Sequence, residues 1–336
     1  MRKVLKSLCA IIFLLPILIS GQSKVGTTAG NFLTIPVGAR ASAMGGAFVA
    51  VADDGTTSYW NIGGLSRLKQ GEVSLAYTQW FVGTDHNWIS LAIKTDADNA
   101  IGISINQLDY GEEEITTERR PDGTGQMWSA SDISIGLSYA RNLTDRFSIG
   151  GTVKYIQQKI WNESASCFAL DVGLLFITQL EGMKIGMNIS NFGTEMKMDG
   201  KDLRQPVDVD PSHTGNNEHV VSILETDSWN LPLTFTLGVS YEAISSTDWK
   251  LTLATDAVYP NNNNSYLNVG TELVWNNLFY ARTGYHSLFN QSAEEGLSIG
   301  MGIGYSFGSF SARIDYSYME YGIFEGISRY GVSILF

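Results

Sequence analysis

Alternation of apolar residues with small or polar residues, at a period of two, is the feature that most constrains this chain. It is clearest over 231–242 and 296–307, where Leu, Ile, Val, Met or an aromatic residue fills every second position and Gly, Ser or Thr fills the positions between. Successive side chains of a β-strand point to opposite faces, so each run predicts a strand with one apolar face and one small or polar face.

About fourteen such runs follow one another to the end of the chain, and most hold eight to twelve residues. A tilted membrane strand needs about 9–11 residues. The sequence therefore predicts an all-β fold, a transmembrane antiparallel β-barrel formed by residues 71–336. The predicted strands are 72–80, 87–94, 99–108, 129–140, 146–157, 166–177, 183–190, 231–242, 248–258, 265–275, 278–286, 296–307, 309–318 and 326–336.

The connections between these runs alternate in length. The short set is 95–98, 141–145, 178–182, 243–247, 276–277 and 308, and the other set is longer and richer in charge, with 191–230 the longest. Transmembrane barrels have short periplasmic turns and longer extracellular loops, whereas a soluble β-sandwich gives no reason for strict alternation. We therefore expect both termini on the periplasmic side.

Aromatic residues on the apolar faces gather near the predicted strand ends, where amphipathic rings meet lipid headgroups. The expected girdle consists of Tyr77, Trp88, Tyr139, Phe147, Tyr241, Trp249, Trp275, Tyr305 and Tyr318.

The opposite faces carry charge, six groups of each sign. Facing lipid near the midplane would cost Lys or Arg about 2–4 kcal/mol, so these residues are predicted to face the lumen. Balanced signs favour ion pairs in a filled lumen, and a substrate path is the alternative. The residues are Lys94, Lys154, Lys184, Lys250, Arg282, Arg313, Glu72, Asp171, Glu242, Asp256, Glu272 and Asp315.

The first residues predict export. Arg2, Lys3 and Lys6 precede a short apolar stretch that ends at the small residues Ser20 and Gly21, as in a signal peptide spanning 1–21. Cys9 lies inside the apolar stretch, which argues against a lipoprotein. Together with the strands, this predicts the outer membrane of a diderm bacterium, with outer-membrane lipid around the barrel.

The last residues read RYGVSILF and end on Phe336. Gly331 and the hydrophobic residues Ile334 and Phe336, at the third-last and last positions, resemble the C-terminal signal read by the barrel assembly machinery. We expect this machinery to be a partner.

Other functions find little support in the sequence. A net charge of −12 argues against nucleic-acid binding. The segment 296–300 matches the serine-hydrolase pattern, but Ser298 lies in an alternating strand rather than at a strand–helix elbow. Four scattered histidines and Cys167, the one cysteine after the predicted signal peptide and expected to be a packing residue, suggest no metal site. We expect no enzyme, cofactor or metal; the clustered loop acids are either solvated or, less simply, calcium ligands.

Residues 22–70 have no place in the wall. A barrel of about fourteen strands is too wide to fill with its own side chains, so this segment is predicted to fold in the lumen as a hatch. Its small residues would pack closely against the wall, and its charges would meet the inward charges. The expected hatch residues are Arg40, Asp53, Asp54, Tyr59, Trp60 and Asn61, and the glycines after Asn61 are expected to form a tight turn into the first strand.

The segment GARASAMGGAFVAVADDGTTSYWNIGGL at 38–65, followed by alternating strands to a terminal Phe, resembles the PorV/PorQ family of outer-membrane proteins within the FadL-like fourteen-stranded barrels. That family usually has Asn-Pro-Ala-Gly-Leu where this chain has Asn61 to Leu65, so a proline-fixed turn is absent. The resemblance implies one of two roles. One is type IX secretion, with secretion components and the C-terminal sorting domains of cargo as partners. The other is uptake of long-chain fatty acids or another hydrophobic ligand. The polar, acidic loop 191–230 favours the first.

Overall fold

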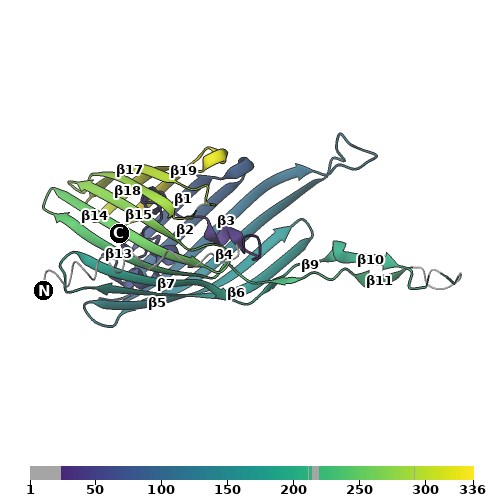
Figure 1. Ribbon diagram of the computed structural model, residues 1–336, viewed down its shortest axis with the longest axis horizontal. Coiled ribbons are helices and arrows are strands. Elements are labelled where there is room, and N and C mark those ends of the chain that lie inside the picture. Colours follow the sequence, from purple (N-terminus) through teal and green to yellow (C-terminus); the bar gives the residue numbers. More distant parts are fainter. Residues whose placement is uncertain (1–23, 211, 214–218, 291) are drawn as a thin grey trace.

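The computed structural model describes residues 24–336 except 211, 214–218 and 291 (Figure 1). Fourteen antiparallel strands form a closed barrel, because β5 pairs with β6 and β1 with β19. The wall strands are β1 Glu72–Gln79, β2 Asp85–Lys94, β3 Asn99–Glu114, β4 Met127–Asn142, β5 Phe147–Ile160, β6 Glu163–Ile177, β7 Met183–Gly193, β13 Thr234–Ser245, β14 Trp249–Pro260, β15 Tyr266–Trp275, β16 Phe279–Leu288, β17 Leu297–Phe307, β18 Phe310–Glu320 and β19 Gly326–Leu335.

Every predicted run corresponds to one wall strand, and the predicted fold class is confirmed. The longer connections differ in detail. Strands β3 and β4 extend past their predicted ends, so much of 109–128 is a projecting hairpin (Figure 1). The connection 191–230 contains five short strands, of which β9 pairs with the edge of β6. They are β8 Met196–Lys197, β9 Asp199–Gly200, β10 Arg204–Val207, β11 Val220–Ile223 and β12 Ser228–Trp229.

The two faces of the wall differ as the alternation predicts. Leu137 in β4 is 62% exposed, and its neighbour Ser138 is 6% exposed. Exposed apolar residues continue in this way around the barrel. An apolar outer surface of this kind suits the hydrocarbon region of a bilayer. The backbone suits it too, because the strands of a closed barrel satisfy their hydrogen bonds with one another.

The expected aromatic girdle needs one correction. Trp88 is only 4% exposed and faces the lumen, where its ring meets Tyr59 with the centroids 5.8 Å apart. The reason is register: Trp88 shares the inward face of β2 with His86 and Ser90, which are both buried. Phe147 is half-buried. The remaining expected residues are exposed on the outside, namely Tyr77, Tyr139, Tyr241, Trp249, Trp275, Tyr305 and Tyr318.

Short helices occupy the part of the chain before β1. They are η1 Asn31–Thr34, α2 Ala39–Ala43, α3 Thr57–Trp60 and η2 Ile62–Arg67. No helix in the described ranges is long and apolar enough to cross a membrane. The predicted signal peptide, residues 1–21, lies outside the described residues.

This N-terminal segment, residues 24–70, runs from one end of the barrel to the other. At the long-loop end, the Ala29 amide donates to the Asn230 carbonyl. At the short-turn end, Arg67 donates to the carbonyls of Thr144 and Asp145. The barrel strands begin and end on the short-turn side, as expected for the C-terminus. The first described residues lie near the long-loop end, and the N-terminus itself lies outside the described residues.

We expect a Phe336→Ser change to reduce the amount of assembled barrel severalfold. The Phe336 backbone closes the β1–β19 seam through two hydrogen bonds with Gly71, at 2.9 and 3.1 Å. Phe336 stays 44% exposed, so the about 1.5–3 kcal/mol gained by fully burying such a side chain overstates its contribution to the stability of the barrel. A severalfold loss of assembled barrel would therefore reflect recognition of Phe336 during assembly. Heat-modifiable gel migration of outer-membrane fractions measures this. Wild-type levels of the variant would contradict the predicted signal.

Candidate functional site

Glycines on the inner wall let the N-terminal segment lie directly against the strands. A Cβ at Gly270 or Gly284 would overlap the backbone of Met44, and one at Gly186 would overlap the backbone of Val49. Overlap of this kind with backbone atoms leaves no room for any larger side chain. The small residues of the alternating pattern are therefore the surface on which the segment packs.

Polar wall side chains hydrogen-bond the backbone of the segment. Asp256 Oδ2 accepts from the amides of Phe48 and Val49, at 2.8 and 2.9 Å. Ser298 Oγ donates to the Ala43 carbonyl at 3.0 Å. Ser298 of the hydrolase-like pattern is thus occupied in holding the segment.

A closed ring of alternating charges joins the segment to three wall strands. Arg40 bonds Glu272 of β15 at 2.7 Å and Asp54 at 3.0 Å. The ring continues from Glu272 to Arg282 at 2.6 Å and on to Asp315 at 2.6 Å. Arg313 then bonds Asp315 at 2.8 Å and closes the ring on Asp54 at 3.0 Å. We call these six residues the charge ring.

The ring brings together six of the predicted site residues. Their side chains are at most 14% exposed, so each charge depends on its neighbours rather than on water. Asp53 adds a further contact to Arg40 at 2.6 Å from the rim. Burial alone would raise the pKa of the Asp54 carboxyl, but the guanidinium groups of Arg40 and Arg313 outweigh burial and hold this pKa below its ordinary value of 3.8.

The other predicted inward charges lie apart from the ring. Lys154 pairs with Asp171 at 2.5 Å, and Lys250 pairs with Glu242 at 3.1 Å near the short turns. The buried Glu72 accepts from Ser74 Oγ.

Three further predicted residues fix the shape of the segment. The Tyr59 hydroxyl donates to the Leu33 carbonyl at 3.1 Å, and Trp60 Nε1 donates to the Val37 carbonyl at 2.9 Å. Asn61 Nδ2 donates to the carbonyls of Val49 and Leu174, and its side-chain oxygen caps η2. The glycines after Asn61 thus start a 3₁₀ helix instead of the expected tight turn.

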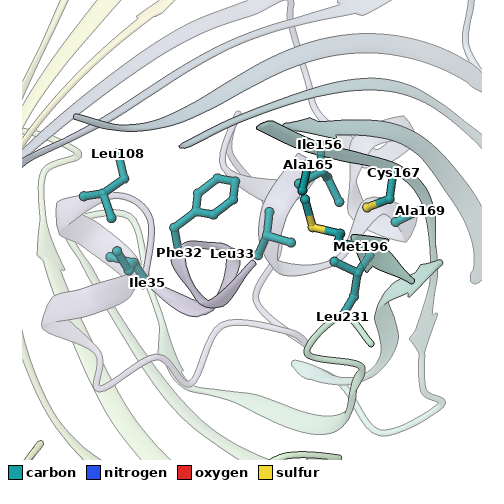
Figure 2. Packing of buried hydrophobic residues seen from close by; sticks show 10 residues of the cluster. All are labelled: Phe32, Leu33, Ile35, Leu108, Ile156, Ala165, Cys167, Ala169, Met196 and Leu231. Atoms are coloured by element: carbon teal, nitrogen blue, oxygen red, sulfur yellow. The ribbon is translucent and has the colours of Figure 1, made fainter. Parts of the chain in front are cut away.

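A cavity of about 210 Å³ lies at the long-loop end, between the segment and strands β5, β7 and β13–β16. An apolar cluster borders it, in which Phe32 and Leu33 of the segment lie between Leu108 and Ile35 on one side and Ile156 and Cys167 on the other (Figure 2). Cys167 is a buried packing residue, as expected.

Polar and apolar groups both line the cavity, with the polar groups slightly in excess. Its lining includes Asn188, Tyr266, Asn268 and His286, none of which the sequence analysis selected. Their inward parity could have been read from the alternation, but the strands that carry them meet only in the closed barrel. Within the described ranges, no group of three or more His, Cys, Asp or Glu residues is arranged to hold a metal ion.

Solved structures share this architecture. The chain resembles the CymD monoaromatic hydrocarbon channel, with 12% identity, a TM-score of 0.57, and coverage of 89% of this chain and 96% of that one. It also resembles the Pseudomonas putida toluene transporter TodX, with 13% identity, a TM-score of 0.55, and coverage of 89% and 96%. At these identities the likeness establishes the fold alone.

The fold is that of a FadL-like β-barrel, closed by fourteen antiparallel strands. Residues 19–210 match the family described as type IX secretion system protein PorV, and the chain belongs to that family. No curated protein matches the chain in sequence.

We expect Gly270→Val to loosen the N-terminal segment. Its added methyls would collide with the Met44 backbone, and overpacking of this kind costs about 1–3 kcal/mol. Residues 38–60 should become sensitive to protease in the purified barrel. Gly151→Val is the matched control, because a Cβ there meets only the Asp171 carbonyl oxygen at an ordinary 3.6 Å. Equal sensitivity of the two variants would rule out this packing role.

We expect Arg40→Met to release the segment as well, because removing one partner of a buried ion pair costs about 3–5 kcal/mol. In the wild type, the same release should follow acidification. Since the pKa of Asp54 is lowered by its ion pairs, its contribution is present above about pH 4 and is lost as the pH falls through that lowered pKa.

Protease sensitivity and single-channel conductance, measured from pH 7 to pH 3, test both expectations. The exposed pair Lys197–Glu225, 3.9 Å apart, supplies the control Lys197→Met, which should behave as wild type. Release of the wild-type segment between pH 5 and pH 7 would be inconsistent with the charge ring as its anchor.

Proposed function

We propose that this protein is a type IX secretion component that receives secreted cargo at the outer membrane through the C-terminal sorting domains of that cargo. The observation that carries the proposal is the PorV family match over residues 19–210. In this role, residues 22–70 act as a hatch that keeps the lumen closed while cargo is handled at the extracellular end.

The packing of the N-terminal segment supports the hatch. Residues 32–66 are nearly all buried, and α2 contacts β16 to β19 while η2 contacts β3 to β6. Wall glycines, backbone hydrogen bonds and the charge ring hold the segment on several sides. A segment held in this way suits a barrel that does not work as an open pore.

The long-loop end supports contact with proteins. The β10–β11 hairpin projects far beyond the barrel (Figure 1). Val221 and Ile223 on it are 69% and 63% exposed, so the loop 191–230 is less uniformly polar than its sequence suggests. Exposed strand edges with apolar side chains are suited to strand addition by a peptide partner.

The alternative is uptake of long-chain fatty acids or other hydrophobic molecules, which the fold shared with hydrocarbon channels favours. The polar lining of the cavity disfavours it, since sites for hydrophobic ligands are mostly apolar. Fold alone does not decide between the two, because one fold serves many functions.

We expect a strain lacking this protein to retain sorting-domain proteins inside the cell envelope, while its uptake of labelled fatty acid stays normal. Complementation with the wild type should restore surface attachment.

A variant without residues 38–60 should assemble, because the hydrogen bonds of the wall close from strand to strand, but it should conduct ions and sensitise cells to bulky antibiotics. Normal surface attachment combined with lost fatty-acid uptake would instead establish the alternative.

A further inference from the structure

The polar cavity at the long-loop end carries an inference that is independent of secretion. We propose that it binds a neutral sugar, as one saccharide unit. The cavity measures about 210 Å³, below the roughly 300–1,000 Å³ of pockets for drug-sized ligands, so it suits a single ring rather than a long oligosaccharide.

Side-chain hydrogen-bonding groups that the described residues leave wholly or partly unpaired line this cavity. The Asn188 side chain is 5% exposed and forms no hydrogen bond with the described residues. Asn268 is 2% exposed; its side-chain oxygen accepts from the Ser287 amide, whereas its Nδ2 group has no acceptor among the described residues. Both amides line the cavity and are available to a ligand, so a ligand rich in hydroxyls is favoured here.

Two more groups extend this set within the described part of the chain. Among the described residues, the Tyr266 hydroxyl has no hydrogen-bond partner, and His286 is bonded only through Nδ1, to Ser287 Oγ at 2.7 Å. Donors and acceptors therefore face the cavity from β7, β15 and β16 together. A polyhydroxylated ring can donate and accept at each of these positions.

Aromatic rings supply the second half of a sugar site. Tyr59, Trp60 and Tyr266 all line the cavity. Hydrogen bonds to the Leu33 and Val37 carbonyls fix the Tyr59 and Trp60 rings in place. Fixed aromatic faces next to polar groups match the two surfaces of a sugar, whose C–H face is apolar and whose edge bears hydroxyls.

The charges of the lining disfavour an anionic ligand, since Glu295 also belongs to it. Lys154 is the one cation among the lining residues that the structure describes, and Asp171 and Asn191 already occupy it. An anion would therefore find no free cation in this lining. An alkyl chain would leave the amides of Asn188 and Asn268 without partners, which disfavours a fatty acid.

The sugar has two possible sources with the same chemistry, a free saccharide or the terminal unit of a surface glycan. The test uses the full-length barrel in a detergent without a sugar headgroup. Quenching or shift of Trp fluorescence, with calorimetry, would follow titration with neutral hexoses, N-acetylhexosamines and a neutral surface polysaccharide. Binding of monosaccharides indicates the free source, and binding of polysaccharide alone indicates the glycan end.

Two variants remove groups that the fold does not use. Asn188→Leu and Tyr266→Phe should each weaken sugar binding about three- to tenfold, the effect of one lost hydrogen bond. Asn87→Leu and Tyr259→Phe on the outer face are matched controls and should bind as wild type. The proposal is overturned if the wild type binds no neutral sugar, if the first two variants bind as tightly as wild type, or if a hydrocarbon competes for the cavity more strongly than any sugar.

Discussion

The closed ring of Arg40, Glu272, Arg282, Asp315, Arg313 and Asp54 is the interaction on which the arrangement of the lumen depends. Each charge lies between two of opposite sign, so none is left buried and alone. Removing water from a single charge costs several kcal/mol, which only close partners can offset. The register of β15, β16 and β18 and the position of the N-terminal segment must therefore be set together, since the ring closes only when all four are in place.

The glycines of the inner wall solve a related problem of size. Fourteen strands enclose more space than their own inward side chains fill, and here the backbone of another segment fills it. Main chain in a lumen brings its own polar groups, and Asp256 and Ser298 satisfy part of them. The apolar positions of the alternating pattern thus face lipid, and its small or polar positions pack against the N-terminal segment.

The sequence predicted the parts of this structure that depend on local periodicity. All fourteen strands and the inward direction of the charges follow from parity, which each strand displays by itself. The prediction for Trp88 is wrong because it rests on an aromatic residue near a strand end. Trp88 and Lys94 are an even number of residues apart on β2, so parity places both on the inward face. The partners within the ring could not be predicted, because Arg40 and Glu272 are far apart in sequence and meet only through barrel register. The same holds for the cavity, whose polar groups come from several strands.

Contacts within the N-terminal segment connect the cavity to the charge ring. Trp60 lines the cavity, and its Nε1 bonds the Val37 carbonyl, which lies shortly before Arg40. Arg40 also lies 5.1 Å from the centre of the Phe48 ring, which in turn packs edge-on against Trp60. These contacts form a continuous path between the long-loop end and the buried charges. A shared fold with hydrocarbon channels does not determine what such a path responds to, since the ligand is set by the side chains of the site. In this chain those side chains include amides, hydroxyls and fixed aromatic rings, and the proposed sugar site rests on them.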